Sequence, residues 1–383
     1  MLGHIWRFFV ALADWRSLLR RPFEFEVVFL TNIRDATDKK RFLGDWVPSL
    51  GHFNGPRYWF KNVSGRTRGI YSLSTDLVHK SAISVARTQC IQAIEYVQAR
   101  GAKVILLAAS TKRLFGRDGA ELKEMFPSLL FTIGDNGTAF LLISETMRAL
   151  SKAKLPVGSR VCVIGPDGFL GSIIAKRLIE QKYCVVGISN SSRNCGDLEV
   201  VNSFDDLGEV DAVIACSHSS SLRLNSENID KIRIKSKKLL VVDVAEPNNL
   251  TESEYAKVKE VVVRQDAGNG YNPHLKYVLS WVTYRMFRLS RGVTFGCFME
   301  TLVWAKAMKD EPNNSSLRNL NLFEVNDSNM KIISELFDKY QVVAPVPKCF
   351  GKKVQSFDLD LNRLPIVINT EYSSVEEDQF ILS

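Results

Sequence analysis

Short runs of consecutive apolar residues alternate along most of the chain with segments in which apolar residues recur at helical spacing. The apolar runs predict strands at 25–29, 66–73, 103–109, 129–133, 161–165, 184–188, 212–215, 239–244 and 261–263. The helical spacing predicts helices at about 76–99, 120–125, 138–150 and 298–307. Apolar strands separated by helices are typical of parallel sheets that are covered on both faces, so the pattern predicts an α/β fold.

One stretch, VCVIGPDGFLGSIIAKRL at 161–178, combines a strand, a tight turn and a helix. Gly165, Gly168 and Gly171 space the turn, and Phe169 and Leu170 begin the helical pattern. Glycines allow a sharp turn that brings backbone N–H groups and a helix N-terminus close to a pyrophosphate. These five residues are therefore candidates for binding a dinucleotide. The alternative is a glycine-rich turn that binds no ligand.

The end of the following strand indicates which dinucleotide would bind. It reads SNSSR at 189–193, without the acidic residue that usually bonds the ribose 2′-hydroxyl of NAD. Asn190 and Ser191 offer polar side chains, and Arg193 can form a charge-assisted hydrogen bond with a 2′-phosphate. We therefore predict NADPH as cofactor, with a solvated polar loop as the alternative interpretation.

This pattern divides the chain into four parts. Residues 151–277 are predicted to form a Rossmann-type, doubly wound NADP-binding domain. Residues 23–150, completed by about 278–345, are predicted to form a second α/β domain that carries substrate and catalysis, as in the two-domain plan of amino-acid dehydrogenases. Residues 1–22 form an N-terminal amphipathic helix in this prediction, and 346–383 form a tail.

Composition narrows the possible functions. The chain has 383 residues, of which 45% are hydrophobic, so it can bury two cores. Seven cysteines without a CxxC pair, and five histidines without metal-ligand spacing, suggest neither disulfides nor a metal site, and they fit a reducing cytoplasm. The net charge of +8 favours acidic partners. The basic residues are scattered, which disfavours nucleic acid.

Residues 1–21 place aromatic and aliphatic side chains at helical spacing beside several arginines. Asp14 interrupts the apolar run, which is too short in uncharged residues for a transmembrane helix and lacks a signal-peptide cleavage pattern. Two interpretations remain: a helix lying in a membrane interface, and an amphipathic helix docked on its own protein.

Cys297 is the candidate nucleophile that the residues themselves indicate. It follows Gly296 in the string GVTFGCFMETLVW, next to a predicted helix start, where a thiolate is stabilised. The alternative is an ordinary buried cysteine, because free cysteine is among the most buried residue types.

Five strings in order across about 25–339 resemble the long-chain acyl-acyl-carrier-protein reductases, which make fatty aldehydes from thioesters. They are LLAASTKRLF, FTIGDNGTAF, GPDGFLG, VDVAEPNNL and TFGCFMETL. The resemblance implies that Cys297 accepts the acyl group from an acyl-carrier protein or acyl-CoA. It also implies that NADPH reduces the resulting acyl-enzyme to an aldehyde.

The chain departs from that family where it has Gly137 in place of a histidine and Lys112 in the string ASTK. Lys112 after one strand and Asp135 after the next resemble the Lys/Asp dyad of shikimate-type dehydrogenases, in which the two residues share proton transfer. A structural ion pair or turn cap is the alternative role for both. The remaining hypothesis is a non-catalytic nucleotide-binding protein.

Overall fold

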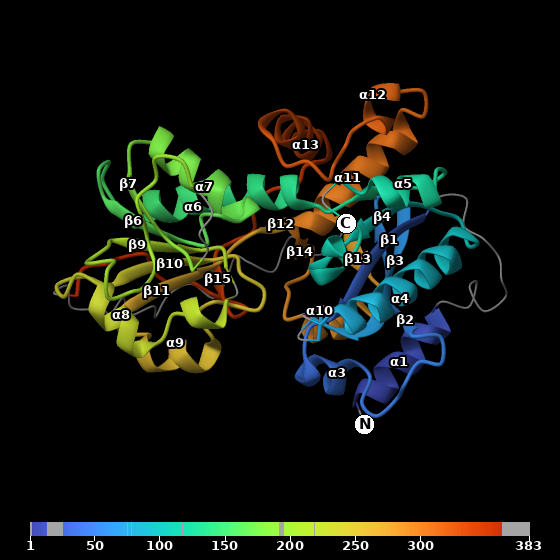
Figure 1. The fold of residues 1–383 in the computed structure, drawn as a ribbon, viewed down its shortest axis with the longest axis horizontal. Helices are drawn as coiled ribbons and strands as arrows, with labels where there is room; N and C mark the ends of the chain where they lie inside the picture. The colour runs from blue at the N-terminus through green and yellow to red at the C-terminus, as the bar shows by residue number, and fades with distance from the viewer. Residues whose placement is uncertain are drawn as a thin grey trace, which may run out of the picture.

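The computed structural model describes residues 2–13, 26–74, 76–77, 79–116, 118–190, 195–217 and 219–361. Its two six-stranded sheets lie in different halves of the molecule (Figure 1). Both contain consecutive parallel strands joined through helices, so the predicted α/β fold class is confirmed.

The first sheet has the strand order β13-β2-β3-β1-β4-β5. Its strands are β1 (Glu26–Ile33), β2 (His52–Phe60), β3 (Val63–Leu73), β4 (Ala102–Leu107), β5 (Leu130–Thr132) and β13 (Leu275–Tyr277). Strands β3, β1, β4 and β5 run parallel, whereas β2 and β13 add antiparallel pairs at one edge.

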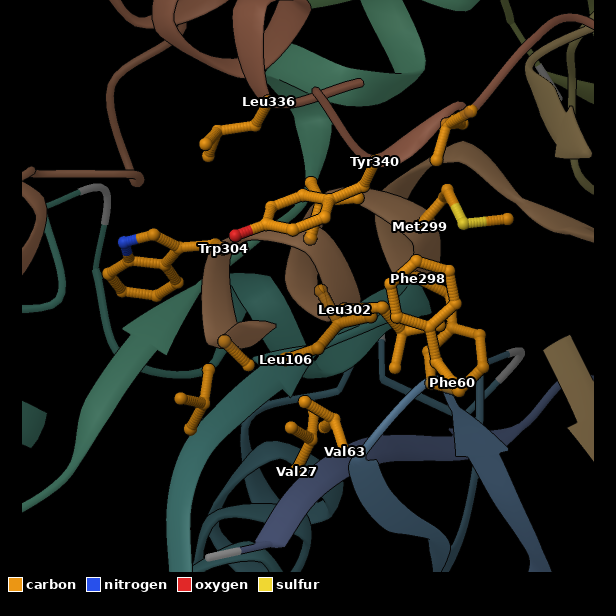
Figure 2. Close-up of a cluster of buried hydrophobic side chains, with 14 of the residues drawn as sticks. Val27, Phe60, Val63, Leu106, Phe298, Met299, Leu302, Trp304, Leu336 and Tyr340 are labelled. Atoms are coloured by element: carbon orange, nitrogen blue, oxygen red, sulfur yellow. The ribbon is translucent and has the colours of Figure 1, made fainter. Parts of the chain in front are cut away.

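Helices cover both faces of this sheet because alternate strand residues point to opposite sides. One face packs on α4 (Lys80–Gln98) and α5 (Ala120–Met125). The other face packs on α11 (Gly296–Asp310), which α13 (Asp327–Tyr340) covers in turn. Figure 2 shows this second core, where Phe298, Leu302 and Trp304 of α11 lie between the strands and α13.

The second sheet has the strand order β11-β10-β9-β6-β7-β8 and is entirely parallel. Its strands are β6 (Arg160–Ile164), β7 (Cys184–Ile188), β8 (Val200–Val201), β9 (Ala212–Ala215), β10 (Leu239–Asp243) and β11 (Val262–Asp266). Helix α7 (Phe169–Glu180) and part of α6 (Asp135–Lys152) cover one face, and α8 (Ser226–Ile232) and α9 (Glu252–Val258) cover the other.

Helix α6 connects the two halves (Figure 1). Its first part packs on α11, and its last part packs on α7 and the second sheet. The chain returns after β11 through Gly268 to the small sheet of β12 (Asn269–Tyr271) and β14 (Val293–Phe295). The buried Glu145 of α6 accepts hydrogen bonds from the backbone N–H groups of Gly268, at 2.6 Å, and Asn269, at 3.4 Å, and so ties the helix to this return crossing.

Several element predictions need correction. Strand β2 reads HFNGPRYWF, whose glycine, proline and polar residues hide the strand pattern, so it was not predicted. Helix α4 begins at Lys80 rather than 76, and α6 begins three residues before the predicted 138, because Gly134 starts its first turn. The remaining helices are α1 (Leu2–Ala13), α3 (Ala36–Phe42), α10 (Ser280–Met286) and α12 (Ser315–Arg318). The described part of the tail contains a hairpin of β15 (Lys348–Cys349) and β16 (Lys352–Lys353). The rest of the tail, 362–383, lies outside the described residues.

Candidate active site

The strand order of the second sheet places a switch point between β6 and β9. From β6 the chain first adds β7 and β8 on one side and then crosses to add β9, β10 and β11 on the other. In open α/β sheets a crevice forms at the carboxyl ends of the strands where the order reverses, and ligands bind there. The glycine turn after β6 and the loop after β9 lie at this crevice, where Gly165 approaches Ser217 so closely that a Cβ on the glycine would be 2.7 Å from the serine Cβ.

The glycine turn fits a dinucleotide pyrophosphate. Gly165 has a φ of +80°, and a Cβ on Gly171 would overlap the carbonyl oxygen of Gly165, so both positions need glycine for the turn to close. A Cβ on Gly168, the residue before α7, would have only the Gly165 carbonyl oxygen within 4 Å, at 3.4 Å. The space over Gly168 is therefore open at the helix N-terminus, where a phosphate can accept hydrogen bonds from backbone N–H groups.

The other predicted cofactor residues are distributed around this turn. Phe169 is exposed at the first position of α7, and Leu170 packs partly against the core beneath it. Asn190 is exposed after β7 and donates a hydrogen bond to Ser221 Oγ at 2.6 Å. Ser191 and Arg193 lie outside the described residues, so their part in the NADPH prediction stays a prediction.

Sequence reasoning missed Asp167, a carboxylate within the glycine turn itself. Its Oδ1 accepts a hydrogen bond from Ser189 Oγ, at the end of β7, at 2.7 Å. The end of β7 is where an acidic residue would meet a ribose 2′-hydroxyl, so Asp167 brings a negative charge close to that position. The acidic residue in GPDGFLG was the signal for it.

The first sheet carries a second group of polar residues at the carboxyl ends of its strands. Lys112 lies on the short helix Ala109–Arg113 after β4, and Asp135 is the first residue of α6 after β5. Lys112 Nζ lies 2.9 Å from one carboxylate oxygen of Asp135 and 3.1 Å from the other. Asp135 is buried, whereas the Lys112 side chain keeps 29% of its surface exposed. The ammonium group is thus held by Asp135, and the Lys112 side chain as a whole is partly accessible to solvent.

The N-termini of α6 and α11 meet beside this pair. A Cβ on Gly134 would overlap Cys297, and a Cβ on Gly137 would lie 2.7 Å from the Cβ of Glu300. Only glycine permits the two helices to approach this closely. The structure therefore brings Lys112, Asp135 and Cys297 into one cluster, although they are far apart in the sequence.

The expected activation of Cys297 stays a prediction, and the surroundings of the thiol oppose it. Cys297 does lie in the first turn of α11, but burial raises the pKa of its thiol to about 12, an effect that Lys112 opposes and that Asp135 and Glu300 reinforce. Desolvation disfavours a thiolate more strongly here than the helix N-terminus favours it.

Glu300 is a further residue that sequence reasoning missed, although an acidic residue within the apolar helix FMETLVW was a visible signal. Its carboxyl group is fully buried and accepts hydrogen bonds from Thr132 Oγ1 and the Gly137 backbone N–H, each at 2.6 Å. It thereby caps the N-terminus of α6, which has no side-chain cap of its own. Burial raises the pKa of Glu300 to about 7, against these hydrogen bonds.

The two groups of residues lie on the same side of the molecule. Gly268 lies between the two groups. A Cβ at this position would be 3.3 Å from the methyl group of Thr138, which is in the same turn of α6 as Asp135. It would be 2.5 Å from a methyl group of Val244, the residue directly after β10. The carboxyl edge of the second sheet therefore faces the first turn of α6. Among the described residues, no group of three or more His, Cys, Asp or Glu could hold a metal ion.

No family model matches the chain, and no curated protein matches it. Solved structures that match include a glycerate dehydrogenase related protein from Thermoplasma acidophilum, with 17% identity and a TM-score of 0.32 over 43% of this chain and 65% of that one. A D-isomer specific 2-hydroxyacid dehydrogenase family protein from Klebsiella pneumoniae has 14% identity and a TM-score of 0.33 over 63% and 79%. An NADPH-dependent glyoxylate/hydroxypyruvate reductase from Sinorhizobium meliloti has 17% identity and a TM-score of 0.25 over 33% and 58%. The chain spans less than two thirds of the first and third of these structures.

The resemblance to the acyl-acyl-carrier-protein reductases is contradicted by these comparisons, because several of the matching structures are described as 2-hydroxyacid dehydrogenases and none of those reported as an acyl-carrier-protein reductase. The strings that suggested it lie where the fold itself requires particular residues. GPDGFLG forms the dinucleotide turn, and Asp243 of VDVAEPNNL is buried in an ion pair with Arg264 at 2.9 Å. Such constraints recur in unrelated families with the same kind of fold.

Proposed function

We propose that this chain is an NADP(H)-dependent oxidoreductase that interconverts an alcohol and a carbonyl compound, with Lys112 and Asp135 as its proton-handling pair. The observation that carries the proposal is the Lys112–Asp135 contact at the carboxyl ends of β4 and β5, with the Lys112 side chain partly exposed to solvent. A general acid must reach its substrate and keep a fixed direction, and this pair meets both requirements.

A dinucleotide held by the glycine turn would supply the hydride. Lys112 holds the proton that the carbonyl oxygen takes up when its carbon is reduced, and the ammonium group is left as a neutral amine that solvent protonates again. Asp135 accepts both close contacts from Nζ, so it orients the ammonium group and balances its charge. In the oxidation direction the amine accepts the hydroxyl proton. Neither direction needs a covalent intermediate on the protein.

The test is a comparison of Lys112→Met and Cys297→Ser in an assay of NADPH oxidation with a panel of 2-oxo acids, ketones and aldehydes. Lys112→Met removes the proton donor but keeps the length of the side chain, and it should lower kcat by about 10²–10⁴-fold. NADPH binding, followed by fluorescence, should persist because the glycine turn is untouched. Cys297→Ser should retain most of the activity.

A second candidate is reduction of an acyl thioester through Cys297. The observation that favours it is the position of Cys297 in the first turn of α11, in contact with Gly134 at the start of α6, whereas the raised pKa of its thiol counts against it. Intact mass after incubation with acyl-CoA or acyl-carrier protein, without NADPH, distinguishes the two. An acyl adduct that Cys297→Ser abolishes, together with an inactive Cys297→Ser enzyme, would replace the first proposal with the second.

The choice of NADP(H) over NAD(H) rests on Arg193 and on the absence of an acidic residue in SNSSR. Asp167 opposes it by placing a carboxylate at the end of β7. Affinities of the wild type for NADPH and NADH test the choice directly, and equal affinities would contradict it.

A further inference from the structure

Helix α1 has two apolar faces, although docking on the protein uses only one. Trp6 and Val10, one turn apart, are buried, and the Trp6 ring lies 5.9 Å from that of Phe42. On the opposite side Phe8 is 64% exposed, and Ile5 and Phe9 are exposed beside it. Residues Leu2–Ala13 of the predicted helix therefore dock on the protein and also carry an outward apolar stripe, whereas 14–22 lie outside the described residues.

The loop after α3 extends this apolar surface. Trp46, Val47 and Leu50 are exposed, and the guanidinium group of Arg7 lies 4.8 Å from the centre of the Trp46 ring. Arg7 thus links the helix to the loop. We call these six exposed residues the α1 patch: Ile5, Phe8, Phe9, Trp46, Val47 and Leu50.

Basic residues lie next to the α1 patch. The last turn of α3 carries Lys39, Lys40 and Arg41, and α3 contacts α1 through Phe42. The acidic residue of α3, Asp38, is buried and bound by Arg34 at 2.8 Å, so it does not neutralise this edge. Of the described patch and loop residues, Asp45 supplies the exposed negative charge.

We propose that the α1 patch and the basic edge of α3 bind the surface of a bilayer that contains anionic lipid. Exposed aromatic residues insert at the boundary between headgroups and acyl chains, and lysine and arginine beside them attract anionic headgroups. A second copy of the chain suits the surface less well, because two-fold pairing would bring like-charged α3 edges together. Within the described ranges no helix is long and apolar enough to cross a membrane, so the contact proposed is interfacial.

The test uses the full chain with phosphatidylcholine vesicles, with and without phosphatidylserine, in a sedimentation assay. Phe8→Ser/Phe9→Ser removes the aromatic stripe but keeps Trp6 and Val10, whereas deletion of the helix would expose the surface beneath them. We expect this variant to weaken binding to the anionic vesicles by about ten-fold or more. Lys39→Gln/Lys40→Gln should weaken it by several-fold and reduce its sensitivity to salt.

The matched control is Val157→Ser, a position that is 67% exposed in the loop before β6, on the other half of the molecule. It should bind as the wild type does, and thermal melting should show all three variants folded. Equal binding by the wild type and Phe8→Ser/Phe9→Ser would overturn the proposal, as would equal losses in the control. A dimer in light scattering that the same variant dissociates, without vesicle binding, would assign the surface to a second copy.

Discussion

Glu300 places a carboxyl group in the core beside the candidate catalytic pair, so stability should depend on its protonation. Burial raises its pKa to about 7, from an ordinary value of 4.5. At 1.36 kcal/mol per pH unit, this difference corresponds to about 3 kcal/mol of unfolding free energy. Because the folded state binds the proton more tightly, this stability is fully present below pH 4.5 and is lost as the pH rises through about 7.

The perturbation is Glu300→Gln. A glutamine oxygen can still accept from the Gly137 N–H, and its amide group can donate to Thr132 Oγ1, so both hydrogen-bonding positions stay occupied. The variant should unfold with a smaller dependence on pH, and at pH 8 it should be more stable relative to the wild type than at pH 4.5 by about 3 kcal/mol. Urea unfolding followed by circular dichroism at pH 4.5–8 measures this.

Glu145→Gln is the matched control, since it removes another buried carboxyl group, whose pKa burial raises to about 8. In the wild type, ionisation of Glu145 should lower the free energy of unfolding as the pH rises to about 8. Glu145→Gln should abolish this loss and leave the pH dependence that Glu300 contributes unchanged. If Glu300→Gln shows the same pH dependence as the wild type, the carboxyl group is not protonated preferentially in the fold, and the reasoning fails.

Two further predictions concern the dinucleotide turn. Gly171→Ala should lower the free energy of unfolding in urea by about 1–3 kcal/mol and abolish NADPH binding, because its methyl group would overlap the Gly165 carbonyl. Gly168→Ala should keep normal stability and lose only NADPH binding. Equal losses of stability in the two variants would contradict this prediction. Arg193→Ala should weaken NADPH binding by about 1.5–3 kcal/mol, the value of a charged hydrogen bond, and leave NADH binding unchanged. Fluorescence titration with both cofactors checks this, and parallel losses for NADPH and NADH would rule out a contact with the 2′-phosphate.

Local sequence determined those features whose causes lie within a few residues. Strands β6, β7 and β9 lie where continuous apolar runs predict them, because strands covered on both faces need apolar residues throughout. The glycine spacing predicts the turn before α7, since the closest approach within it, of Gly171 to the Gly165 carbonyl oxygen, joins residues six apart. Strand β2 escaped prediction because its pairing with β3, rather than its own composition, makes it a strand.

Tertiary structure decided the chemistry of the candidate site. The pairing of β4 with β5 brings Lys112 to Asp135, and the approach of α6 to α11 at Gly134 and Gly137 adds Cys297. The sequence predicts a helix start at Cys297, which by itself favours a thiolate. The desolvation that raises the pKa of Cys297 comes instead from neighbours that are distant along the chain. The buried carboxyl group of Glu300 depends likewise on donors more than 160 residues away. Charge states depend on surroundings in three dimensions, and the fold alone supplies those surroundings.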